Sequence, residues 1–115
     1  METARVLGIG GRALIALLFV LAGIAKILGP RPFLEHMRQF HVPTVLLPAV
    51  IALELGAGAT LLVGFRSREA AAALALFCIL TAAVFHRGWA DRAERTLFFK
   101  DLAIAGGLLV VAAAA

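Results

Sequence analysis

Four long apolar stretches, separated by short polar or proline-containing segments, make up most of the chain. A hydrocarbon core of about 30 Å needs about 20 helical residues at 1.5 Å each, so each stretch is long enough to cross most of a bilayer. The pattern predicts four membrane-spanning helices over residues 13–28, 44–65, 69–86 and 97–114. Because the number of crossings is even, both ends of the chain are expected on one side of the membrane.

A fifth, shorter segment lies between the first two spans. From Phe33 to His41, apolar residues recur at helical spacing among charged ones. The segment is too short to cross a bilayer and is typical of an amphipathic helix in the membrane interface. Pro48 is expected to bend the second span, because proline cannot supply the N–H of an i−4 hydrogen bond. We therefore expect an all-α integral membrane four-helix bundle with a short interfacial helix between helices 1 and 2, forming a single domain over residues 1–115.

The composition supports a membrane location. Hydrophobic residues make up 63% of the chain and charged residues 16%, whereas soluble domains are about 45–50% apolar and about 25% charged. A chain this short could not hide four apolar stretches in a soluble core. The formal net charge is +4 and the arginines border the apolar stretches, an arrangement that fits anionic lipid headgroups better than nucleic acid.

The single cysteine excludes some kinds of redox chemistry, and the arginines indicate how the chain is oriented in the membrane. Cys78 is the single cysteine, so the chain can form no internal disulfide and no Cys-x-x-Cys relay. The first span lacks a small-x-small cleavage site at its end, so we expect it to be retained. Arginines are nearly balanced between the two sides, but Arg66 and Arg68 in the short second loop favour cytoplasmic termini.

Small residues on the second span predict a helix contact. Ala52, Gly56, Thr60 and Gly64 recur at intervals of four, which places them on one helix face. Helices in lipid associate through such faces because small side chains let two backbones approach closely. We expect this stripe to be a contact seam, with Gly58 offering a further close approach.

Five ionisable residues in or beside the spans form the candidate polar site. They are Lys26, Glu54, His86, Lys100 and Asp101. Glu54 lies deepest, about 15 Å into the second span at 1.5 Å per residue, and an isolated ionised carboxylate there is costly. We therefore predict that Glu54 is held by one of the two lysines, or by a ligand that they bind with it. The alternatives are an interhelical hydrogen bond by Glu54, snorkelling of the lysines to the headgroups, and anchoring of the interface by His86.

Other kinds of site find little support in the sequence. His36 and His41 do not share a helix face, and no acidic or cysteine partner stands at metal-ligand spacing, so no metal site is expected. The glycines at residues 8–11 precede a membrane span rather than following a strand, which excludes a nucleotide-binding loop.

The order of these features resembles the DoxX family of small bacterial four-helix membrane proteins. The segments that carry the resemblance are residues 12–26, 54–58, 64–68, 85–86 and 99–107. They contain the ordered set of Arg, Lys, Glu, His and Lys-Asp positions. Family members often carry Asn where this chain has Asp101.

The resemblance implies a multi-pass protein of the bacterial inner membrane. Some relatives serve as the membrane subunit of a thiosulfate:quinone oxidoreductase, and others are linked to oxidoreductase complexes that handle oxidative stress. We therefore expect a subunit without catalytic activity of its own that binds a quinone-like or other amphipathic molecule, or a partner oxidoreductase, through the five polar residues. A small proton-coupled transporter in which Glu54 titrates, and a structural scaffold, are the alternatives. Quinone is the one cofactor considered, and the expected partners are the lipid bilayer, a second copy of the chain or the oxidoreductase.

Overall fold

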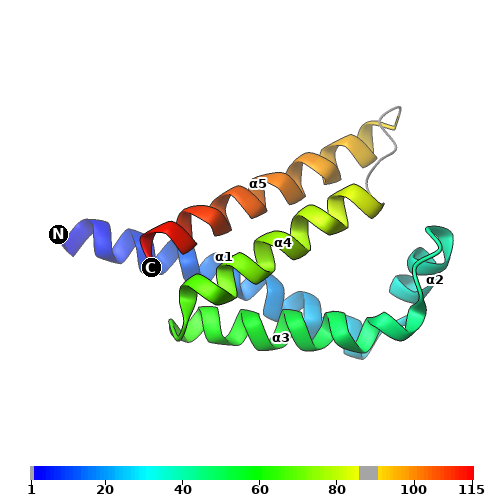
Figure 1. Ribbon diagram of the computed structural model, residues 1–115, viewed down its shortest axis with the longest axis horizontal. Coiled ribbons are helices and arrows are strands. Elements are labelled where there is room, and N and C mark those ends of the chain that lie inside the picture. The colour runs from blue at the N-terminus through cyan, green and yellow to red at the C-terminus, as the bar shows by residue number, and fades with distance from the viewer. Residues whose placement is uncertain (1, 86–90) are drawn as a thin grey trace. The chain divides into compact units, whose positions relative to one another are not determined.

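The computed structural model describes residues 2–85 and 91–115, and the regular structure in these ranges is helical throughout. The elements, in chain order, are α1 (Glu2–Leu28), α2 (Arg31–Gln39), the single 3₁₀ turn η1 (Thr44–Leu46), α3 (Leu47–Val63), α4 (Ser67–Phe85) and α5 (Arg92–Ala114) (Figure 1). The predicted all-α class and the short helix between the first two spans are confirmed.

Two of the long helices begin at least five residues earlier than predicted. Helix α1 starts at Glu2 and α5 at Arg92, whereas the hydropathy pattern placed these starts at residues 13 and 97. The apolar stretch marks only the part of a helix suited to hydrocarbon, and backbone hydrogen bonding continues beyond it. At α5 the side chain of Asp91 caps the helix by accepting a 2.9 Å hydrogen bond from the Ala93 N–H.

The expected bend at Pro48 is wrong. Residues Thr44–Leu46 form the 3₁₀ turn η1, and α3 begins only at Leu47, so Pro48 lies in the first turn of α3. The N–H groups of a first helical turn have no intrahelical acceptor, so proline loses no hydrogen bond there. Pro48 therefore marks the start of α3.

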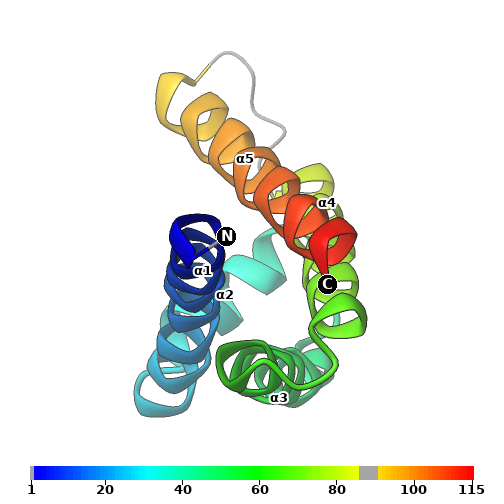
Figure 2. The same ribbon diagram turned by 90° about the vertical axis from the view of Figure 1, so that its left-hand side faces the viewer.

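The chain divides into two compact units, Met1–Phe65 and Arg66–Ala115. In the first unit α1 packs against α3, and the segment containing α2 and η1 connects the two helices. In the second unit α4 and α5 pack side by side, as both ribbon views show (Figures 1 and 2). Each unit is thus a pair of long helices.

Glycines bring α1 and α3 close together. A Cβ added at Gly23 of α1 would lie 2.7 Å from Leu55 Cγ, and one added at Gly58 of α3 would lie 3.3 Å from the backbone nitrogen of Val20. Each helix therefore receives side chains of its partner at a glycine, as expected where helices associate in lipid. The predicted approach at Gly58 is confirmed.

The predicted seam along Ala52, Gly56, Thr60 and Gly64 is wrong for Gly56. Gly56 is exposed, and nothing lies within 4 Å of the position that its Cβ would occupy. The buried face of α3 instead carries Leu47, Glu54, Gly58 and Leu61.

Alanine dominates the buried face of α4. Its buried residues recur at helical spacing and are Ala70, Ala71, Leu74, Ala75, Cys78 and Ala82. On α5 the buried residues are Ala105 and Leu108. The Arg68 guanidinium donates a 2.7 Å hydrogen bond to the backbone oxygen of Ala115, which joins the start of α4 to the end of α5.

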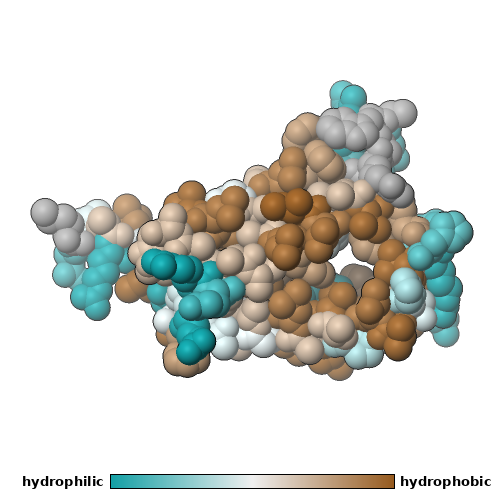
Figure 3. Space-filling model, in the orientation of Figure 1, coloured by the Kyte–Doolittle hydropathy of each residue, from teal (hydrophilic) through white to brown (hydrophobic). Residues whose placement is uncertain are grey.

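The remaining helix surface is largely apolar. Large aliphatic side chains such as Leu14 and Leu21 on α1 and Leu109 on α5 are exposed, and Figure 3 shows hydrophilic residues gathered toward the ends of the helices. The segments Glu2–Leu28, Thr44–Val63, Ser67–Phe85 and Arg92–Ala114 are all long and apolar enough to cross a membrane. These surfaces suit contact with lipid.

Candidate functional site

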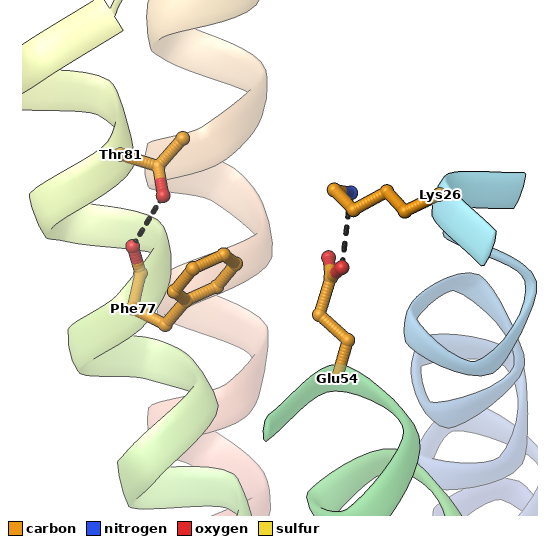
Figure 4. Close-up of polar contacts among 4 residues, drawn as sticks. All are labelled: Lys26, Glu54, Phe77 and Thr81. Carbon is orange, nitrogen blue, oxygen red and sulfur yellow. Dashed lines mark hydrogen bonds and ion pairs between the residues drawn. The ribbon is translucent and has the colours of Figure 1, made fainter. Parts of the chain in front are cut away.

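A buried ion pair joins α1 to α3. The Nζ atom of Lys26 lies 2.9 Å from Oε1 of Glu54, and Figure 4 shows the two side chains extended toward each other. Only 15% of the Lys26 side chain and 4% of the Glu54 side chain are exposed. The prediction that a lysine holds Glu54 is therefore confirmed for Lys26.

The helical repeat explains why these two residues meet. Lys26 stands three residues after Gly23, on the same α1 face as the buried Ala16 and Phe19. Glu54 stands four residues before Gly58 on the buried face of α3. The glycines that bring the two backbones together thus also set the distance that the lysine stem has to span.

An aromatic ring also contacts the ammonium group. The Nζ atom of Lys26 lies 4.6 Å from the ring centroid of Phe33, in the first half of α2. A cation within about 6 Å of a ring face is attracted by the ring's quadrupole. Lys26 is consequently held between the carboxylate of α3 and the ring of α2, and does not simply snorkel to the headgroups.

The pair offers complementary hydrogen-bonding groups within an apolar surrounding. An ammonium group carries three donors, and an ionised carboxylate accepts at two oxygens. One Lys26 to Glu54 contact does not use all of these groups. The pair therefore keeps hydrogen-bonding capacity, both donor and acceptor, beyond its own contact.

A second cation at the other end of the helix pair was not predicted as part of a site. Arg12 of α1 is half-buried, and a Cβ added at Gly64 would lie 2.9 Å from its Nη2 atom. Gly64 ends α3 in the left-handed conformation, with φ of 84°. A cation at a helix C-terminus is favoured by the helix dipole and the last carbonyl groups. In the sequence, Arg12 is indistinguishable from the other arginines that border spans.

The other predicted site residues belong to the second unit or lie outside the described residues. Lys100 is exposed on α5. Asp101 is half-buried and shares the face of Ala105 and Leu108, which is the buried face of α5. His86 falls outside the described residues. In the ranges 2–85 and 91–115, no three His, Cys, Asp or Glu side chains are grouped so that they could hold a metal ion.

Comparison with known proteins places the chain in a family. Residues 9–87 match the sequence model of the DoxX family, and this region includes both Lys26 and Glu54. Inner membrane protein YqjF of Escherichia coli (strain K12) is 41% identical over 101 residues, which cover 88% of this chain and 78% of that protein. Inner membrane protein YphA of the same organism is 28% identical over 108 residues, covering 88% and 77%. No solved structure matches the chain.

The family match covers well over half of the chain, and the two relatives, both inner membrane proteins, are matched over more than three quarters of their length. The helices described above also supply four candidate spans. The chain therefore belongs to the DoxX family, and it is a multi-pass protein of the inner membrane.

Proposed function

We propose that the chain is a non-catalytic membrane subunit that binds the polar head of a quinone-like molecule at Lys26 and Glu54, and that it serves a membrane oxidoreductase. The observation that carries the proposal is the buried ion pair, 2.9 Å between Lys26 Nζ and Glu54 Oε1, on two helices that are long and apolar enough to cross a membrane. Ionisable groups at membrane depth mark sites more often than surface charges do.

The chemistry of the pair fits both oxidation states of a quinone. A quinone carbonyl can accept a hydrogen bond from the Lys26 ammonium, and a quinol hydroxyl can donate one to the Glu54 carboxylate. The exposed aliphatic side chains of α1, among them Leu17 and Leu21, provide an apolar surface for an isoprenoid tail. In this proposal the residues of the chain bind and orient the head group, while the partner oxidoreductase exchanges electrons with it.

The proposal is tested by quinone binding to the purified full-length chain in lipid nanodiscs. Decylubiquinone and a short-chain menaquinone serve as probes in equilibrium titrations of the parent chain, of Lys26→Met and of Glu54→Gln. Loss of a charged hydrogen-bonding partner costs about 1.5–3 kcal/mol, so each variant is expected to raise Kd about tenfold or more. Glu35→Gln is the matched control, because Glu35 is exposed on α2 and its amide variant makes the same chemical change.

The outcomes separate the proposal from its alternatives. Unchanged Kd in folded Lys26→Met and Glu54→Gln would contradict it, and a loss of stability alone would then identify the pair as a structural lock. Quinone-independent proton uptake into liposomes that disappears in Glu54→Gln would instead support a proton-coupled carrier.

A further inference from the structure

A shallow hollow on α5 is separate from the ion pair. It has a volume of about 600 Å³, and its lining is drawn from the first half of α5: Arg92, Arg95, Thr96, Phe99, Lys100 and Ala103. Positions 92, 95, 96, 99 and 103 follow the helical repeat and share one side of the helix. The hollow is therefore a continuous surface of one element.

The charges on this side of α5 are all positive. None of the acidic residues Asp91, Glu94 and Asp101 lines the hollow, and Asp101 lies on the buried face with Ala105. Within the described part of the chain, Arg92, Arg95 and Lys100 form no ion pair. Three cations thus face a common space in which no described carboxylate neutralises them.

The hollow is also graded from polar to apolar along the helix. Arg92 and Arg95 stand in the first turn of α5, whereas Phe99 and Ala103 lie farther along the helix. At 1.5 Å per residue, Ala103 is about 16 Å from Arg92 along the helix axis. Phe99 is 54% exposed. Lys100 follows Phe99 in the apolar part, and its long stem lets the ammonium reach back toward the interface.

We infer that this hollow binds an anionic phospholipid, with the phosphate held by Arg92, Arg95 and Lys100 and the upper acyl chain lying along Phe99 and Ala103. Arginine and lysine are strong partners for phosphate oxygens. A free phosphate would pair with the cations equally well, but it would make no contact with the apolar side chains of Phe99 and Ala103. The graded lining therefore selects the lipid. This inference does not depend on the proposed quinone site.

The inference is tested by native mass spectrometry of the detergent-purified full-length chain, titrated with phosphatidylglycerol and, separately, with phosphatidylethanolamine. The variant Arg92→Gln/Arg95→Gln/Lys100→Gln is expected to raise the phosphatidylglycerol Kd about a hundredfold at low salt, since each surface cation contributes roughly fivefold to binding of anionic lipid. The charge-matched control is Arg5→Gln/Arg31→Gln/Arg38→Gln, which removes three exposed cations elsewhere and is expected to leave that Kd within about twofold.

A second variant tests the hollow without changing its charge or its cations. Ala103→Phe fills the apolar end and is expected to raise the phosphatidylglycerol Kd severalfold while the chain stays folded. An equal loss of affinity in the control triple variant, or no effect of Ala103→Phe, would show nonspecific attraction by net charge and overturn the inference. Displacement of the lipid by millimolar inorganic phosphate would overturn it in favour of a free anion site.

Discussion

The two helix pairs, α1 with α3 and α4 with α5, bury different kinds of residues. Helices α1 and α3 meet where Gly23 and Gly58 each receive a side chain of the partner, and they place a charged pair between them. Helices α4 and α5 meet mainly through alanines and leucines. In α4 the hydroxyl of Thr81 turns back to the Phe77 carbonyl of the same helix, 2.8 Å away (Figure 4). The first pair thus joins its helices with a buried ion pair, whereas the buried residues of the second are apolar, with the half-buried Asp101 on the same face of α5.

This difference is the reason for placing the proposed site in the first pair. Apolar packing of small residues is enough to hold two helices together in lipid. The charged pair between α1 and α3 is therefore more than association requires. Its cost at membrane depth is the physical reason for proposing a small-molecule site at that pair.

The largest effect is expected when the ion pair loses its cation. Lys26→Met leaves the Glu54 carboxylate buried without its partner, and breaking a buried pair in this way costs about 3 kcal/mol. The free energy of unfolding, measured by titration with sodium dodecyl sulfate, should fall by that amount. Lys100→Met changes an exposed lysine of α5 and should alter stability by no more than about 0.5 kcal/mol. Equal losses of unfolding free energy in Lys26→Met and Lys100→Met would contradict the distinction drawn between the two helix pairs.

The next effect concerns the close approach of α1 and α3. Gly58→Leu forces a side chain against the backbone of Val20 and should destabilise the chain by about 2 kcal/mol, as overpacking does. Gly56→Leu is the matched control, because Gly56 has open space around it. A larger loss of stability in Gly56→Leu than in Gly58→Leu would indicate that the stripe through Gly56 is the contact face after all.

A smaller effect is expected at the end of α3. Gly64 has φ of 84° and Arg12 stands beside it, so Gly64→Ala should cost about 1–2 kcal/mol in backbone strain and displacement of the guanidinium. Gly29→Ala, at a glycine without positive φ and with only a 4.0 Å contact, should change stability by no more than about 0.5 kcal/mol. Thermal unfolding in detergent would compare the two, and similar melting temperatures would contradict the role of Gly64.

The smallest effect is expected in the second pair. Thr81→Val removes a hydroxyl that donates within α4, and such local bonds contribute little to helix stability. The free energy of unfolding should change by about 0.5 kcal/mol or less. A loss comparable to that of Gly58→Leu would show that the pairing of α4 and α5 also depends on the Thr81 hydroxyl.

The sequence predicts the helices better than their contacts. Hydropathy located all four spans, since apolar runs of this length are rare outside membrane-spanning helices. It missed the early starts of α1 and α5 because helical hydrogen bonding does not end where apolarity ends. It also chose the wrong face of α3: the four-residue stripe through Gly56 is as regular as the face of Glu54, Gly58 and Leu61. The charge of Glu54 was the signal that could have identified the buried face, because a deep carboxylate has to face a partner.

For the candidate site, the sequence selected residues by type and depth but could not pair them. Lys26 and Lys100 were equivalent candidates for Glu54, because the end of the first span and the start of the fourth are expected on the same side of the membrane. The helical phase distinguishes Lys26, which continues the face of Ala16, Phe19 and Gly23. The contact of Phe33 with Lys26 depends on the turn between α1 and α2, and no periodicity encodes that turn.

A double-mutant cycle on Lys26 and Glu54 tests the central claim most directly. Lys26→Met, Glu54→Gln and the double variant are unfolded in detergent, and the coupling energy is the departure of the double variant from the sum of the singles. We expect a coupling of about 2 kcal/mol, because the double variant no longer buries an unpaired charge. A parallel cycle of Lys26→Met with Glu35→Gln should be additive within about 0.5 kcal/mol. Additivity in the Lys26 and Glu54 cycle as well would contradict the claim that these two residues form the polar site of the α1–α3 pair.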